Sequence, residues 1–151
     1  MPELSRTILM VEDSPEDVEA TIRALRKTRL ANPVHACHSG DDALEYLYRQ
    51  GRYTDPDAAP RPCMILLDLN LPGTDGRDVL MQIKNDEGLR RIPVVVLTSS
   101  SDPKDVQECY DAGANSYLAK PVDLPGFMRA IERLADYWFE IVLLPNGGGQ
   151  A

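Results

Sequence analysis

Residues 63–76 read CMILLDLNLPGTDG, an uninterrupted apolar run that ends at an aspartate and continues into a segment rich in turn-forming residues. Alternating apolar and polar residues indicate a strand with one wet face, whereas a continuous apolar run is typical of a strand covered on both faces. We therefore predict a buried strand over residues 63–67. Asp68 then stands directly after the carboxyl end of that strand.

The chain on either side of this strand alternates between strand-like and helix-like segments. The other apolar runs occupy residues 7–11, 34–37, 94–97 and 116–119. Helical patterns follow the strands and open near Pro15, Gly40, Gly76, Pro103 and Pro125, two of them with a capping residue directly before the proline. Five strand-then-helix units predict an α/β fold, with a doubly wound, five-stranded parallel sheet and five helices.

The length of 151 residues suits one globular domain. We assign residues 1–144 to this domain, with an extended C-terminal helix, and the glycine-rich residues 145–151 to a flexible tail. Residues 51–62 contain three prolines and form the longest irregular stretch inside the domain.

Composition excludes several classes of partner. The net charge of −8 and the lack of a basic patch argue against nucleic acid and against anionic lipid. The sequence shows no signal peptide and no apolar run long enough to span a membrane. Cys37, Cys63 and Cys109 are odd in number and have no paired spacing. Reduced thiols of this kind predict a cytoplasmic protein.

Chemically capable side chains follow four of the five predicted strands. Glu12 and Asp13 follow the first strand, Asp68 the third, Thr98 the fourth and Lys120 the fifth. The carboxyl ends of parallel strands meet at one edge of the sheet, where open α/β sheets form their sites. We therefore expect three carboxylates, a hydroxyl and an ammonium group to converge there.

Each of these residues has an ordinary explanation when it is taken alone. Asp13 suits a helix cap, Thr98 a loop hydroxyl, and Lys120 a solvated surface position. Taken together they favour a metal site, because clustered carboxylates repel one another unless a cation offsets their charge. Mg²⁺ prefers oxygen ligands and binds phosphate oxygens as well. The pattern therefore indicates phosphoryl chemistry, with one carboxylate as the nucleophile.

The same residues resemble the receiver domain of the two-component response-regulator family over essentially the whole chain. The matching motifs are Glu12-Asp13, LLDLNLPGTDG around Asp68, VVVLTSS around Thr98, and YLAKP around Lys120. Thirty residues separate Asp68 from Thr98, and 52 separate it from Lys120. Five positions thus agree with the family in residue type, order and spacing.

The resemblance implies a role for each matching residue. Asp68 accepts a phosphoryl group from a sensor histidine kinase. Asp13, Asp68 and the backbone carbonyl of Asn70 coordinate Mg²⁺. Glu12, at a position where the family often has Asp, is expected to act on the metal through water. Thr98 and Lys120 contact the phosphoryl group, and Thr98 with Tyr117 forms a conformational switch. The Lys120–Pro121 bond is expected to be cis. The protein is expected to act as a switch and not as an enzyme with a metabolite substrate.

The C-terminal sequence DYWFEIVLLP resembles that of the stand-alone response regulators that partner bacterial and cyanobacterial phytochromes. Those proteins dimerise through the last helix and the segment after it. An apolar run of this length also exceeds what one helix face can bury against its own domain. We expect a homodimer interface at Tyr137, Trp138, Phe139, Val142 and Leu143, with packing onto the chain's own sheet as the alternative.

Other functions remain open at this stage. The kinase could belong to a chemotaxis or phosphorelay system instead of a phytochrome system. A flavodoxin-like cofactor carrier shares the expected fold, but the first loop, EDSPED, is anionic and would repel a cofactor phosphate. A hydrolase with an aspartyl-phosphate intermediate usually has a second acid two residues after the nucleophile, where this chain has Asn70.

Overall fold

The computed structural model describes residues 6–28 and 32–141 of the chain. Its sheet consists of β1 (Ile8–Val11), β2 (Val34–Cys37), β3 (Met64–Leu67), β4 (Val94–Thr98) and β5 (Ser116–Ala119). All neighbouring strands are parallel, in the spatial order β2-β1-β3-β4-β5. The predicted doubly wound α/β fold is thus confirmed, with strand bounds that differ from the sequence-based ranges by one residue at three strands.

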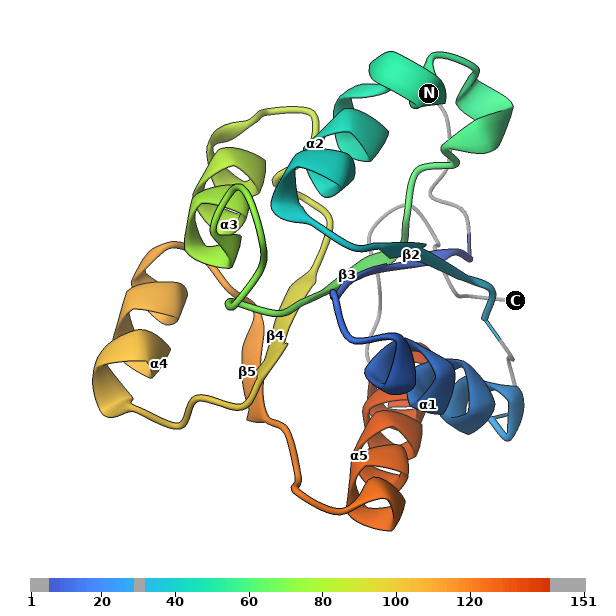
Figure 1. Ribbon diagram of the computed structural model, residues 1–151, viewed down its shortest axis with the longest axis vertical. Helices are drawn as coiled ribbons and strands as arrows, with labels where there is room; N and C mark the ends of the chain where they lie inside the picture. The colour runs from blue at the N-terminus through green and yellow to red at the C-terminus, as the bar shows by residue number, and fades with distance from the viewer. Residues whose placement is uncertain (1–5, 29–31, 142–151) are drawn as a thin grey trace.

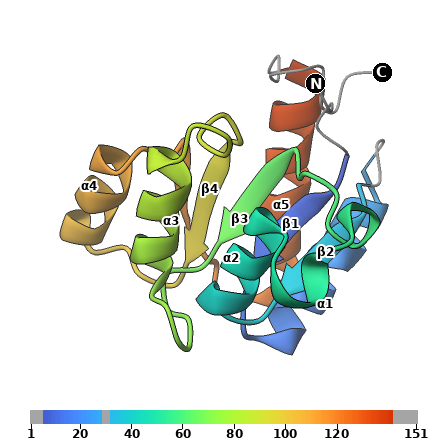
Figure 2. The ribbon, with the colours of Figure 1, turned by 90° about the horizontal axis from the view of Figure 1, so that it is seen from above.

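Five α-helices connect the strands and cover both faces of the sheet. They are α1 (Pro15–Arg26), α2 (Gly40–Tyr48), α3 (Gly76–Asn85), α4 (Pro103–Asp111) and α5 (Leu124–Asp136). Helices α1 and α5 lie side by side on one face, and α2, α3 and α4 cover the other (Figure 1, Figure 2). Each helix begins after a side chain that caps its first turn, namely Ser14, Ser39, Asp75, Asp102 and Asp123.

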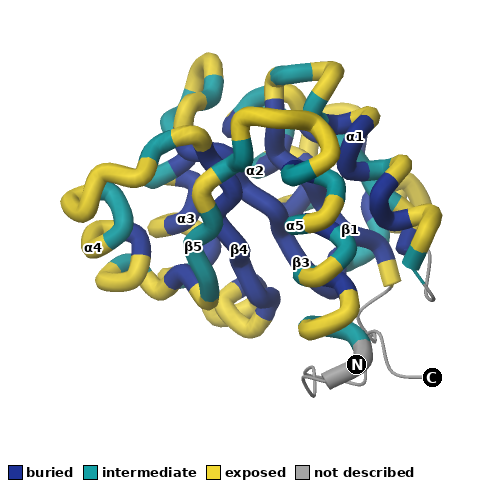
Figure 3. Tube along the Cα trace, turned by 90° about the horizontal axis from the view of Figure 1, so that it is seen from below, coloured by how far each residue is buried: buried dark blue, intermediate teal, exposed yellow. Residues whose placement is uncertain are grey.

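The three central strands are buried along their whole length (Figure 3). They divide their side chains between two cores. In β3, Ile65 and Leu67 pack with α2, α3 and α4, whereas Met64 and Leu66 pack with α1 and α5. Successive strand residues point to opposite faces, so a continuous apolar run supplies both cores at once. This division explains why the strand sequences do not alternate.

The stretch 51–62 is less irregular than we predicted. Two short 3₁₀ helices, Gly51–Tyr53 and Pro56–Ala58, fold it back against α2 and the edge strand β2. Tyr53 is buried there, with its ring centroid 5.2 Å from that of Tyr46 and 5.6 Å from that of His35. Aromatic burial thus anchors a segment whose proline content suggested only a loop.

The last helix does not continue unchanged into the C-terminal apolar run. A π-helical turn, Tyr137–Ile141, follows α5. Trp138 and Phe139 pack partly against the core beneath α1 and α5, whereas Tyr137 is 53% exposed. Val142 and Leu143, which we predicted at an interface, lie outside the described residues.

One backbone expectation is wrong. All peptide bonds among the described residues are trans, including Lys120–Pro121, which we expected to be cis. Trans is the isomer that X–Pro bonds intrinsically prefer. None of the helices among residues 6–28 and 32–141 has the length and apolar character that a membrane span requires.

Candidate functional site

The carboxyl ends of the strands bring the predicted residues to one edge of the sheet. Val11 and Leu67 are register partners, so Glu12 and Asp68 emerge side by side. Thr98 ends β4 opposite Ala119, and the Lys120 N–H donates to the Thr98 carbonyl at 2.7 Å. Parallel pairing therefore fixes the spacing between these residues in space, although they are up to 108 positions apart in sequence.

Lys120 lies at the centre of this edge and binds three carboxylates at once. Its Nζ lies 2.5 Å from Glu12 Oε1, 2.8 Å from Asp17 Oδ2 and 3.0 Å from Asp68 Oδ2. Burial alone would lower the pKa of Lys120, but the hydrogen bonds to Asp17, Glu12 and Asp68 outweigh it and raise that pKa above its ordinary value. The ammonium group is therefore charged at neutral pH.

Asp68 itself is buried, and both of its oxygens are bonded. Its Oδ1 accepts the Thr98 hydroxyl at 2.8 Å and the Asn70 backbone N–H at 3.1 Å, while Oδ2 accepts Lys120. Three donors thus hold the carboxylate in one orientation. The Asn70 side chain is exposed, and its backbone is the part that reaches Asp68.

Negative charge exceeds positive charge at this edge. Oxygens of Glu12, Asp13 and Asp68 all lie within 4.8 Å of one another, and Asp17 adds a fourth carboxylate. Lys120 is the one cation paired with these carboxylates in the part of the chain that the structure describes. Burial raises the pKa of Glu12 to about 7, even though Lys120 hydrogen-bonds to it. An all-oxygen ligand set with an uncompensated charge fits a hard divalent cation.

The loop after β3 is held by two close approaches of the backbone. A Cβ atom on Gly76 would lie 2.3 Å from the Asp68 carbonyl oxygen, and one on Gly40 would lie 2.2 Å from the Thr74 carbonyl oxygen. The Thr74 hydroxyl also donates to Asp41 at the start of α2. Only glycine fits at either position, so these contacts fix the loop that carries Asn70.

The predicted switch residues lie on neighbouring strands, β4 and β5. The Tyr117 hydroxyl donates to the Ser100 carbonyl at 2.8 Å, and the half-buried ring packs against the core under α4. Ser100 Oγ donates in turn to Asp105 at 2.6 Å, and Asp105 accepts Arg77 at 2.8 Å. The Tyr117 side chain is therefore tied to the loop that follows Thr98.

Sequence reasoning missed Asp17. It follows Glu12 by five positions and lies in the first turn of α1, where an acid is favourable for the helix dipole alone. The repeated acids in EDSPED were the available signal. Only the direction in which α1 leaves the sheet shows that this carboxylate reaches Lys120.

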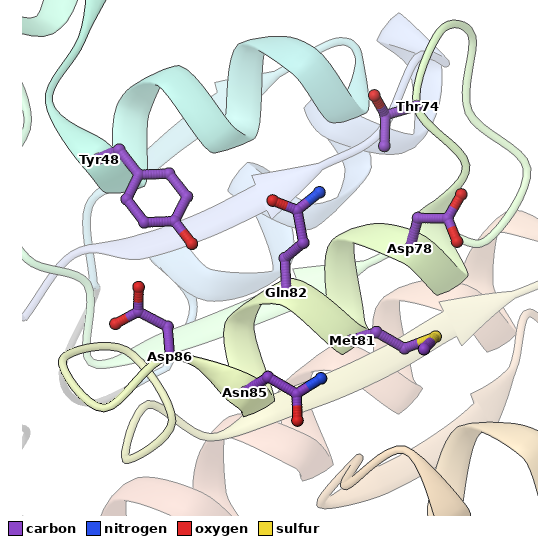
Figure 4. A pocket seen from close by; sticks show the side chains of 7 residues that line it. All are labelled: Tyr48, Thr74, Asp78, Met81, Gln82, Asn85 and Asp86. Atoms are coloured by element: carbon purple, nitrogen blue, oxygen red, sulfur yellow. The ribbon is translucent and has the colours of Figure 1, made fainter.

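Two grooves on the described surface lie away from the strand-end carboxylates Glu12, Asp13 and Asp68. One, of about 530 Å³, runs between α2 and α3 and includes Tyr48, Gln82 and Asp86 among its lining residues (Figure 4). The other, of about 610 Å³, runs between α3 and α4. Neither is lined by Asp68 or Lys120.

Comparison with known proteins agrees with this geometry. The family profile of the response regulator receiver domain matches residues 8–132. The chain belongs to the response regulator receiver family. Receiver domains bind a divalent metal ion and generally act as switches, which agrees with the acidic cluster of Glu12, Asp13 and Asp68.

Individual receivers are similar over nearly the whole chain. Response regulator Rcp1 of Synechocystis sp. is 39% identical over 140 residues, covering 93% of each sequence. The solved structure of the phosphorylated cyanobacterial phytochrome response regulator RcpA has a TM-score of 0.88 and 37% identity, covering 93% of this chain and 99% of its own. The Mn²⁺-bound form of Rcp1 has a TM-score of 0.86 and 39% identity, covering 95% of this chain and 99% of its own. This receiver is therefore related to phytochrome-associated response regulators.

Proposed function

We propose that Asp68 is the phosphoacceptor of this receiver, and that it takes a phosphoryl group from a phosphohistidine of a sensor kinase. The observation that carries the proposal is the set of partners around Asp68. Lys120, Thr98 and the Asn70 N–H orient its carboxylate, while the oxygens of Glu12 and Asp13 lie beside it. Such preorganised donors act on charge that develops during transfer.

The proposed reaction is a displacement at phosphorus. An Asp68 oxygen forms a new O–P bond, the P–N bond to the kinase imidazole breaks, and the bonding electrons leave with that nitrogen. Lys120 and the hydroxyl of Thr98 lie within 3.0 Å and 2.8 Å of Asp68, within reach of phosphoryl oxygens. Glu12, Asp13, Asp68 and the Asn70 carbonyl would hold Mg²⁺, which would supply positive charge near those oxygens.

Thr98 and Tyr117 form the proposed switch. A shift of Thr98 toward the phosphoryl group would move the loop that begins at Ser99, and the Ser100 carbonyl in that loop holds the Tyr117 hydroxyl. The aromatic side chain would then change its contact with that loop. The output of the protein is thus a changed surface near α4 and β5, and not the turnover of a metabolite.

We infer that the partner is a histidine kinase of the phytochrome type. The support is the similarity to Rcp1 and to the cyanobacterial phytochrome response regulator RcpA. A chemotaxis or phosphorelay kinase is the alternative within the family. A cytoplasmic location fits such a partner and the three free, buried cysteines.

We also propose a homodimer through the C-terminal segment of a domain that spans residues 1–144. Residues 145–151, which we predicted as a tail, lie outside the described residues. Tyr137 supports this interface because its side chain is exposed, whereas Trp138 and Phe139 already pack partly against the core of their own domain. Sedimentation with and without beryllofluoride and Mg²⁺ tests this interface. A monomer under both conditions would remove it.

Asp68→Asn tests the phosphoacceptor directly. The variant keeps the size of the side chain but loses the nucleophilic carboxylate, so we expect no label transfer from a phosphorylated histidine kinase. The matched control is Asp78→Asn, an aspartate of α3 outside the strand-end cluster, which should accept label like the wild type. Full transfer to the Asp68 variant would contradict the proposal.

A further inference from the structure

The three carboxylates around Lys120 differ in what else they do. Asp68 is the proposed phosphoacceptor, and Glu12 belongs to the group of oxygens that fits a metal ion. Asp17 has neither role, yet its Oδ2 lies 2.8 Å from Lys120 Nζ, closer than Asp68 at 3.0 Å. An ammonium group has three N–H donors, so these three acceptors use all of them.

Hydrogen bonds that do not involve the carboxylate of Asp17 fix its backbone in α1. Its N–H donates to the Ser14 hydroxyl at 3.3 Å, and its carbonyl accepts the Thr21 hydroxyl at 2.8 Å. These bonds cap and continue α1 whatever the side chain does. The carboxylate is therefore available to contact Lys120 and is not required to start the helix.

A phosphoryl group on Asp68 would accept a hydrogen bond from Lys120, but all three N–H groups of Lys120 are already in use. Lys120 must then release one of its present acceptors. Releasing Glu12, whose side chain is 2% exposed, would leave a buried carboxylate oxygen that water cannot reach in place of Lys120. The Asp17 side chain is 33% exposed, so water can replace the lost bond at small cost. Asp68 remains close because it carries the phosphoryl group.

We propose that Asp17 is a positioning residue that holds Lys120 in the unphosphorylated protein and gives it up to a phosphoryl oxygen when Asp68 is phosphorylated. The inference rests on the proposed function of Asp68. The exchange is noncovalent, since one N–H···O contact breaks, another forms, and no proton is transferred. Asp17 therefore stabilises the unphosphorylated state and opposes phosphorylation.

The test is the affinity for beryllofluoride, a phosphoryl mimic, measured by ¹⁹F NMR at saturating Mg²⁺. Asp17→Ala removes the competing acceptor, so we expect about three- to tenfold tighter binding than in the wild type. Asp17→Asn keeps a neutral acceptor and should lie between the two. Binding of Mg²⁺ alone is titrated separately, because a change explained by metal affinity would overturn the proposal.

Glu16→Ala is the matched control. Glu16 is an acid in the same turn of α1 and carries the same charge, and within the described ranges its carboxylate accepts a hydrogen bond only from the Ser14 hydroxyl, at 3.2 Å. It should therefore bind beryllofluoride as tightly as the wild type does. Equal effects of Asp17→Ala and Glu16→Ala would mean that total charge is responsible, and weaker binding by Asp17→Ala would mean that Asp17 supports the phosphorylated state. Either result overturns the proposal.

A second measurement detects the contact without any ligand. Urea denaturation of metal-free protein gives a double-mutant cycle between Asp17→Ala and Lys120→Met, which should show coupling. The parallel cycle with Glu16→Ala should show none, and absent coupling in the first cycle would again overturn the proposal. If Asp68→Asn still accepts label, the proposed function fails. If label transfer requires Asp68 but the Asp17 variants behave like the control, only the role of Asp17 fails.

Discussion

Two carboxylates in this protein are held by the same kinds of partner, a hydroxyl group and a cation, in surroundings of different charge. Asp42, in the first turn of α2, accepts the Tyr53 hydroxyl at 2.9 Å and the Arg52 guanidinium at 2.8 Å. Asp68, after β3, accepts the Thr98 hydroxyl at 2.8 Å and the Lys120 ammonium at 3.0 Å.

The charge balance separates the two arrangements. Asp42 has one cation to itself, and Arg52 is 67% exposed. Burial alone would raise the pKa of Asp42, but hydrogen bonds from Tyr53 and Arg52 hold it below its ordinary value. Lys120, 12% exposed, instead faces three carboxylates. In the first trio, Asp42, Tyr53 and Arg52, the charges balance, and the contacts hold a loop in place. In the second trio, Asp68, Thr98 and Lys120, the surrounding negative charge exceeds the positive charge, which favours binding of a metal ion and exchange of hydrogen-bond partners.

Replacing the two cations should give the largest contrast. In metal-free protein at pH 7, Lys120→Met leaves Glu12 and Asp68 buried without a counter-ion, so we expect the free energy of unfolding to fall by about 2–3 kcal/mol. Arg52→Met, the control, should change it little because water replaces its exposed contacts. Urea denaturation measures both. If Lys120→Met and Arg52→Met lowered the free energy of unfolding equally, the two cations would not differ in the way that their burial and charge surroundings indicate.

Adding Mg²⁺ should give the next largest effect. At ten times its dissociation constant, a ligand that binds only the folded state adds about 1.4 kcal/mol to the free energy of unfolding. We expect this gain in the wild type and in Asp42→Asn, and its loss in Asp13→Asn, because Asp13 belongs to the oxygen cluster and Asp42 does not. Thermal melts with and without Mg²⁺ measure it. A full gain in Asp13→Asn would exclude Asp13 as a ligand.

The smallest effect concerns the titration of Asp42 in its trio with Tyr53 and Arg52. The pKa of Asp42 in the folded state lies below its ordinary value of 3.8, so its contacts stabilise the fold at pH values above 3.8. This stabilisation is lost as the pH falls through the folded-state pKa. Carboxyl ¹³C NMR should therefore give Asp42 a midpoint below 3.8. Tyr53→Phe removes one donor and should raise that midpoint. A wild-type midpoint at or above 3.8 would contradict the contacts described for Asp42.

The sequence predicted the strand-end residues better than the helix-borne ones. Asp68, Thr98 and Lys120 follow apolar runs, and the geometry of a parallel sheet brings the ends of such runs together. Asp17 depends on the angle at which α1 leaves the sheet, which no local pattern encodes. The π-helical turn after α5 and the burial of Tyr53 depend likewise on tertiary packing.

The division of each central strand between two cores also limits how the length of this chain can vary. Removing one residue within β3 would exchange Leu66 and Leu67 between the cores and displace Asp68 to a different side of the sheet edge. The exposed residues 54–58, between the buried Tyr53 and Ala59, precede β3, so their number can change without altering that parity. We therefore expect natural insertions and deletions to accumulate in residues 54–58 and to be absent from β3.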